Sequence, residues 1–168
     1  MRIPKSLGVA IIAVALTGLS LALAVSALGA KGDPGQPNGP LIRAALAPSM
    51  PAPTDPTIFG VNPGGVPWVL KRGDVRIKRD GTFRLRLQGL VIPNPPGDNT
   101  PGPVMRVSAS LFCGGTAAAT TDPVPISRSG DASINTTVII PSTCLAPVVF
   151  VHPNGNAAAY ISVTGLRS

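Results

Sequence analysis

Alternation of apolar and polar residues, with a repeat of two, is the feature that most restricts what this chain can fold into. Beyond Pro67 it recurs in short runs that Gly- and Pro-rich turns separate. A repeat of two puts successive side chains on opposite faces of a strand, whereas an amphipathic helix repeats every 3.6 residues. With no helical run between the strands, the sequence predicts an all-β domain at residues 66–168. We expect an antiparallel β-sandwich, immunoglobulin-like, of about six to eight short strands, with a small closed barrel as the rival.

The first two runs, residues 74–91, are interpreted as a hairpin whose register follows from the pattern. A two-residue loop would place Ile77 opposite Arg84 and so mix apolar and charged side chains on one face. A three-residue loop at 79–81 pairs Ile77 with Phe83 instead, and it puts Gly81 where a bulged turn requires a positive φ. In this register the side chains that face the core are Val75, Ile77, Phe83, Leu85 and Leu87.

The outward face of that hairpin carries most of the positive charge. Seven of the twelve Lys and Arg residues after residue 30 lie within residues 71–86, against two Asp. The register places Arg76 opposite Arg84, and like charges in such a pair destabilise a sheet unless an anion or water relieves them. It also places Asp74 opposite Arg86. The predicted ligand-binding residues are Arg76, Lys78, Arg84 and Arg86.

This basic face predicts an anionic cell-envelope polymer or an acidic protein as the partner. The alternative is a solvated sheet face whose charges deter edge-to-edge association. Nucleic acid is not expected as a partner, because no aromatic residues interleave with these cations to stack on bases.

Residues 1–30 have the layout of an export signal. Arg2 and Lys5 precede an apolar run, and small residues at Val25 and Ala27 fit a peptidase cut after Ala27, with a cut after Ala30 as the alternative. An uncleaved anchor is the alternative, since the run approaches the roughly 20 residues that span a bilayer, and only this segment would then contact a membrane. Either fate predicts a secreted or extracytoplasmic protein of the cell envelope.

Residues 31–65 are interpreted as a Pro/Gly-rich spacer, mobile or loosely docked. Nine of the twenty prolines lie in residues 31–67. Because proline removes a backbone donor and fixes φ, we expect no strand ladder in this stretch. At most, residues 41–47 would form a short helical turn before Pro48.

The two cysteines, Cys113 and Cys144, are predicted to form a disulfide, because the compartment is oxidising and the count is even. The alternative is a reactive thiol or half of a metal site. A metal site lacks further ligands here, since the chain has no CxxC motif and only one histidine. We therefore expect no metal and no cofactor.

No enzyme active site is predicted. His152 is interpreted as a turn residue at a strand end. A hydrolase would need a nucleophile and an acid beside it, and the candidates Ser127, Ser129 and Asp131 lie in no Gly-x-Ser-x-Gly motif. We expect a non-enzymatic binding or structural module. The second hypothesis is a protein-interaction module that uses the Pro-rich loop 92–103 and the region of Trp68.

Five segments carry a resemblance to known proteins: GDVRI at 73–77, GLVIP at 89–93, VSASLFCGG at 107–115, LAPVV at 145–149 and VTG at 163–165. They resemble a family of exported proteins of unknown function from high-GC Gram-positive bacteria. That resemblance covers residues 66–166, and it implies export and a β domain but no activity. The first hairpin is also loosely similar to the chordin-type repeat domain. The histidine pair that follows the hairpin in that domain is missing here, so no metal site is carried over.

Overall fold

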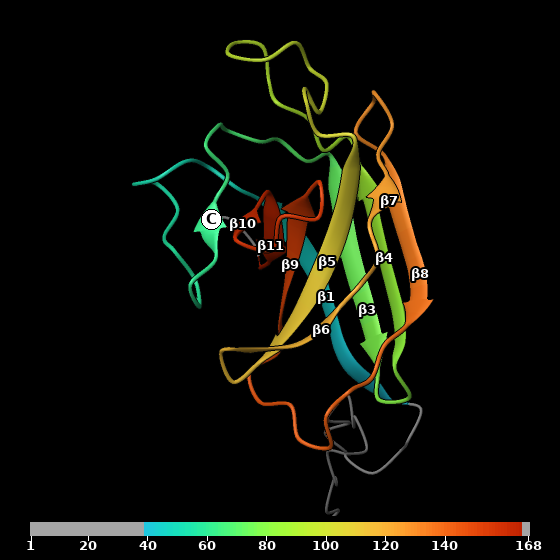
Figure 1. Ribbon diagram of the computed structural model, residues 1–168. Helices are drawn as coiled ribbons and strands as arrows, with labels where there is room; N and C mark the ends of the chain where they lie inside the picture. The colour runs from blue at the N-terminus through green and yellow to red at the C-terminus, as the bar shows by residue number, and fades with distance from the viewer. Residues whose placement is uncertain (1–38, 166–168) are drawn as a thin grey trace, which may run out of the picture. The chain divides into compact units, whose positions relative to one another are not determined.

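The computed structural model describes residues 39–165, and the segment interpreted as an export signal lies outside them. All regular secondary structure in the described part is β-strand, which confirms the all-β prediction (Figure 1). Eight strands follow one path, β6-β5-β9-β11-β1-β3-β4-β8, in which every pair is antiparallel, and β7 pairs with β5. The strands are β1 (Pro40–Pro48), β2 (Asn62–Pro63), β3 (Arg72–Lys78), β4 (Thr82–Gln88), β5 (Arg106–Cys113), β6 (Thr116–Thr120), β7 (Val124–Pro125), β8 (Ala132–Thr137), β9 (Val148–Pro153), β10 (Ala159–Tyr160) and β11 (Ser162–Thr164).

Strand β1 joins the two halves of the sandwich. Its residues 40–45 pair with β3, whereas residues 46–48 pair with β11. The half β1-β3-β4-β8 therefore continues into the half β6-β5-β9-β11, and the apolar sides of both halves enclose one core. Core side chains from the first half include Val75, Ile77, Phe83, Leu85 and Ile134; those from the second include Val107, Ala109, Leu111, Val149 and Val151.

The β3–β4 hairpin has the predicted register. Ile77 pairs with Phe83, and both side chains are buried. Gly81 has a φ of 86°, and a Cβ there would clash with the carbonyl oxygen of Val138. The turn thus needs glycine both for its left-handed backbone and for the close approach of the chain that follows β8.

The expectation that residues 31–65 form no strand is wrong, because β1 lies in the middle of the sheet path. Its two prolines, Pro40 and Pro48, stand at the strand ends, where a missing N–H donor interrupts the ladder least. Between them Ile42, Ala44 and Leu46 alternate toward the core. The segment 41–47 is therefore a strand rather than a helical turn, and the sandwich begins before residue 66.

The half β6-β5-β9-β11 is covered on both faces. Its outer side carries a second apolar cluster in which Phe112 meets Phe150 edge-on at 5.0 Å between ring centroids. The chain that follows β1 closes over this cluster: Phe59 stacks on Phe112 at 6.0 Å, and the Tyr160 hydroxyl donates to the carbonyl oxygen of Pro56 at 2.9 Å. The part of the expected spacer that follows β1 thus packs against the sandwich at Pro56 and Phe59.

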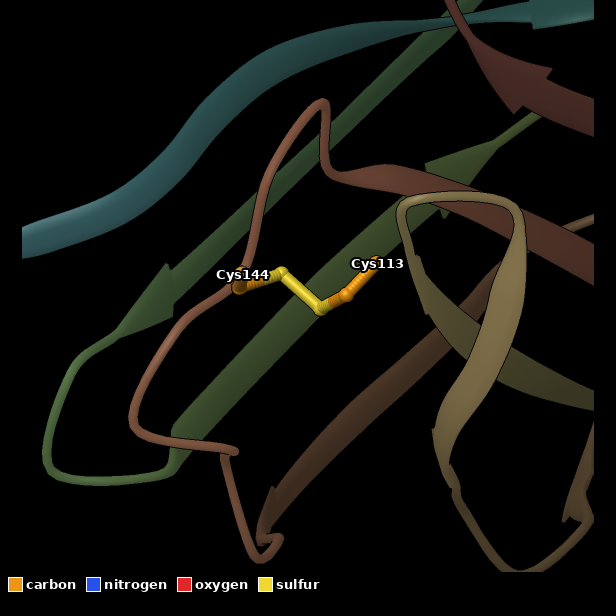
Figure 2. Close-up of a disulfide and its surroundings, with 2 residues drawn as sticks. All are labelled: Cys113 and Cys144. Atoms are coloured by element: carbon orange, nitrogen blue, oxygen red, sulfur yellow. A yellow bond between two sulfur atoms is a disulfide. The ribbon is translucent and has the colours of Figure 1, made fainter.

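Cys113 and Cys144 form the predicted disulfide (Figure 2). It joins the end of β5 to the connection between β8 and β9, with the two Cα atoms 4.8 Å apart and 31 positions between the residues in sequence. A structural disulfide of this kind is compatible with an oxidising, extracytoplasmic compartment.

Candidate anion-binding site

Exposed polar side chains form a line across four adjacent strands, on the outward face of the half β1-β3-β4-β8. Arg43 on β1 pairs with Arg76 on β3, Arg76 pairs with Arg84 on β4, and Arg84 pairs with Asn135 on β8. Neighbouring strands lie about 4.8 Å apart, so three arginines stand side by side over about 10 Å. We call Arg43, Arg76 and Arg84 the arginine row.

Strand alternation is what points this row outward. Val75 and Ile77 flank Arg76 on β3, and Leu85 follows Arg84 on β4, and all three are buried in the core. Because successive side chains of a strand point to opposite faces, the arginines between them project into solvent. The same alternation on β1 leaves Arg43 exposed.

The neighbouring row contains the one carboxylate of this face. Asp74 lies opposite Arg86, as predicted, and Arg86 lies opposite Ser133. Among residues 39–165, however, no ion pair within 4.0 Å joins Asp74 to Arg86 or neutralises a member of the arginine row. The charge of the row is thus left for a ligand or for solvent to balance.

Side chains of the two rows line a hollow of about 410 Å³. Its lining consists of Arg43, Arg72, Asp74, Val75, Arg76, Arg84, Leu85, Arg86, Ser133 and Asn135. Three of the four predicted binding residues, Arg76, Arg84 and Arg86, therefore meet at one place, whereas Lys78 lies outside the lining. Sequence reasoning missed Arg43. The alternation of Ile42, Ala44 and Leu46 between two prolines indicates a strand, but it does not indicate that this strand lies beside β3.

His152 is not a turn residue, contrary to the sequence interpretation. It is a fully buried residue of β9, with Nδ1 2.7 Å from the carbonyl oxygen of Ala159 and Nε2 2.9 Å from Oγ of Ser110. A carbonyl only accepts, so Nδ1 carries the proton and the Ser110 hydroxyl donates to Nε2. Burial lowers the pKa of His152, which favours this neutral form.

The nucleophile candidates predicted from the sequence form no contact with His152. Ser127 and Ser129 hydrogen-bond each other at 2.8 Å, and Ser129 donates to Asp131 at 2.7 Å, so the three form a local turn network. Ser110, which sequence reasoning did not consider, is the hydroxyl that contacts the imidazole. Ser110 and His152 are both buried, so the pair is a structural link between β5 and β9.

Trp68 itself does not lie on the surface. Its side chain is only 3% exposed and packs in the main core, whereas its neighbours Val66 and Val69 are 36% and 43% exposed. A bridge between Val69 and Val91 ties this segment to the sandwich. The region of Trp68 as a contact surface stays a prediction. The Pro-rich loop 92–103 does reach the surface, where it lines a separate hollow together with Met105.

Two further findings bear on the kind of site. Within residues 39–165 no group of three or more His, Cys, Asp or Glu side chains gathers to hold a metal ion. None of the described residues forms an apolar helix long enough to cross a membrane.

Comparison with family models, with curated proteins and with solved structures finds no match for this chain. The resemblances given above therefore stay predictions.

Proposed function

We propose that this protein is an extracytoplasmic, non-enzymatic module that binds anionic polymers through the arginine row. The observation that carries the proposal is the direct pairing of Arg43 with Arg76 and of Arg76 with Arg84, with no ion pair among the described residues to offset it. Like charges placed opposite each other destabilise a sheet, and a bound anion turns that repulsion into attraction. A planar guanidinium also holds a carboxylate or phosphate through two parallel hydrogen bonds.

The compartment supports an envelope polymer as the ligand. The disulfide suits a protein outside the cytoplasm, and the N-terminal sequence has the layout of an export signal. We therefore expect an acidic polymer of the cell envelope as the ligand. The excess of twelve Lys and Arg over seven Asp after residue 30 favours its approach from a distance.

Charge reversal in the row tests the proposal. The double variant Arg76→Glu, Arg84→Glu is expected to weaken binding to polygalacturonate by at least about a hundredfold at low salt, because two cations become two repelling anions. Wild-type binding is expected to weaken steeply as salt is raised. Both side chains are exposed, so thermal denaturation should show little change in stability. Isothermal titration calorimetry measures the affinity.

The matched control reverses two arginines outside the hollow. The double variant Arg106→Glu, Arg128→Glu makes the same change in net charge at exposed positions that do not line the site. We expect it to retain binding within about threefold, as for cations that act only through the overall field. Equal losses in both variants would mean that net charge alone binds the polymer, and full retention by the row variant would reject the site.

A further inference from the structure

We infer that the polymer lies across the strands, from β1 to β8, and that it is an acidic polysaccharide. Its charged groups meet the arginine row, and its hydroxyl groups meet Asn135 and Ser133 on β8. This inference rests on the proposed function and adds to it the direction and the chemical class of the ligand.

The direction follows from where the carboxylate lies. Along β3 the outward positions read Arg72, Asp74, Arg76, so a polyanion that followed the strand would meet a negative charge between two positive ones. Across the strands, Arg43, Arg76 and Arg84 follow one another without an acid. Their spacing of about 4.8 Å suits a chain that carries one charge on each repeating unit.

The chemical class of the ligand follows from the exposed polar residues on β8. Asn135 continues the arginine row, and Ser133 continues the neighbouring row after Arg86. Asn135 Nδ2 donates to Ser133 Oγ at 3.0 Å, and both residues are exposed. The amide oxygen of Asn135 remains an acceptor, and the serine hydroxyl remains a donor. Neutral groups of this kind suit the hydroxyls of a sugar ring better than a fourth anionic group.

A protein partner fits the hollow less well. Protein interfaces depend on an aromatic or apolar anchor near the centre. The only large apolar residues in the lining, Val75 and Leu85, belong to the core and are 1% and 2% exposed. Within the described residues, the exposed large apolar side chains all lie outside the lining: Phe59, Val66, Val69, Met105, Ile139 and Leu145.

The direction is tested by two variants that each remove one charge from the same face. Arg43→Gln removes a cation of the row on β1, whereas Lys78→Gln removes one that follows Arg76 along β3 and lies outside the hollow. On polygalacturonate, Arg43→Gln is expected to lower the affinity by about tenfold and Lys78→Gln by less than about twofold. Equal losses, or a larger loss for Lys78→Gln, would overturn the direction while leaving the proposed function in place.

The class is tested with two polymers of carboxylates. Polygalacturonate carries hydroxyl groups and polyacrylate carries none. Asn135→Ala, and in a second variant Ser133→Ala, should weaken binding of polygalacturonate by about fivefold each and leave binding of polyacrylate within about twofold. Comparing each variant with wild type on one polymer at a time removes the difference in charge density. Equal effects on both polymers, or no effect on either, would overturn the polysaccharide assignment, whereas failure of the wild type to bind either polymer would overturn the proposed function as well.

Discussion

Loss of the disulfide is expected to lower the free energy of unfolding by about 3.5 kcal/mol. The double variant Cys113→Ala, Cys144→Ala removes a link that spans 31 positions of sequence. In the chain-entropy account, a disulfide stabilises a protein by lowering the conformational entropy of the unfolded chain. The effect is about 3 kcal/mol for a 15-residue loop and about 4.7 kcal/mol for a 100-residue loop, and the present loop lies between these two lengths. The link matters here because the loop it closes contains β6, β7 and β8, which form both open edges of the sheet path.

Urea denaturation measures the effect as a lower transition midpoint. The control is wild-type protein treated with a reductant, which should unfold at the midpoint of the double variant, since both lack only the bond. The single variants Cys113→Ala and Cys144→Ala should match it as well. A double variant as stable as the oxidised wild type would contradict the stabilising role of the disulfide.

The β3–β4 hairpin could be predicted in detail because its constraints are local. Each strand keeps one face in the core and one in solvent, so only one register puts Ile77 opposite Phe83 and keeps charge out of the core. That register also predicts Arg76 opposite Arg84, and the structure has this pairing. The central pair of the candidate site was therefore predictable from the side-chain period alone.

The contribution of β1 was not predictable in the same way. Whether a proline breaks a strand depends on where its missing donor would point, and that depends on the neighbouring strand. Pro40 pairs with Lys78 at one end of β1 and Pro48 with Ser162 at the other, and these partners are 38 and 114 positions away in sequence. Arg43 escaped notice for this reason, since it belongs to the site only once β1 lies beside β3.

The burial of two serines on β5 also could not be predicted from the alternation of apolar and polar residues. These serines, Ser108 and Ser110, alternate with apolar residues, a pattern typical of a strand with one face in solvent, yet both are buried. They lie on the side that the second apolar cluster covers. Ser110 hydrogen-bonds Thr120 and donates to Nε2 of His152, which is 42 positions away in sequence. A serine with a distant partner looks in sequence like an exposed one, so neither its burial nor the role of His152 could be inferred.

Acidification below pH 6.5 is expected to destabilise the protein through His152. Burial lowers the pKa of the folded-state imidazole below its ordinary value of 6.5. Above pH 6.5 both the folded and the unfolded chain hold the ring neutral, so stability is constant with respect to this group. As the pH falls below 6.5 the unfolded chain takes up a proton that the folded chain resists, so stability is lost until the pH passes the folded-state pKa. The loss approaches about 1.4 kcal/mol per pH unit at most.

The window between pH 5 and 6.5 reports on His152 by itself, because it is the only histidine and the chain has no Glu. Side-chain hydrogen bonds, chiefly from Thr82, Thr100 and Ser129, lower the pKa of Asp80, Asp98 and Asp131 respectively below the ordinary value of 3.8. The contribution of these carboxylates to the free energy of unfolding is therefore lost only at more acidic pH. Urea midpoints measured across this window should fall with pH for the wild type and stay flat for His152→Gln, which keeps an amide acceptor for Ser110. A wild type as flat as the variant would contradict a neutral, buried imidazole, and a variant as steep as the wild type would assign the dependence to another group. The Ser110–His152 hydrogen bond links β5 to β9 on the side that faces away from the main core, and neither residue lines the candidate site. Protonation of His152 therefore affects the stability of the fold and not the arginine row. We expect the affinity of the row to stay constant down to the pH at which the protein begins to unfold.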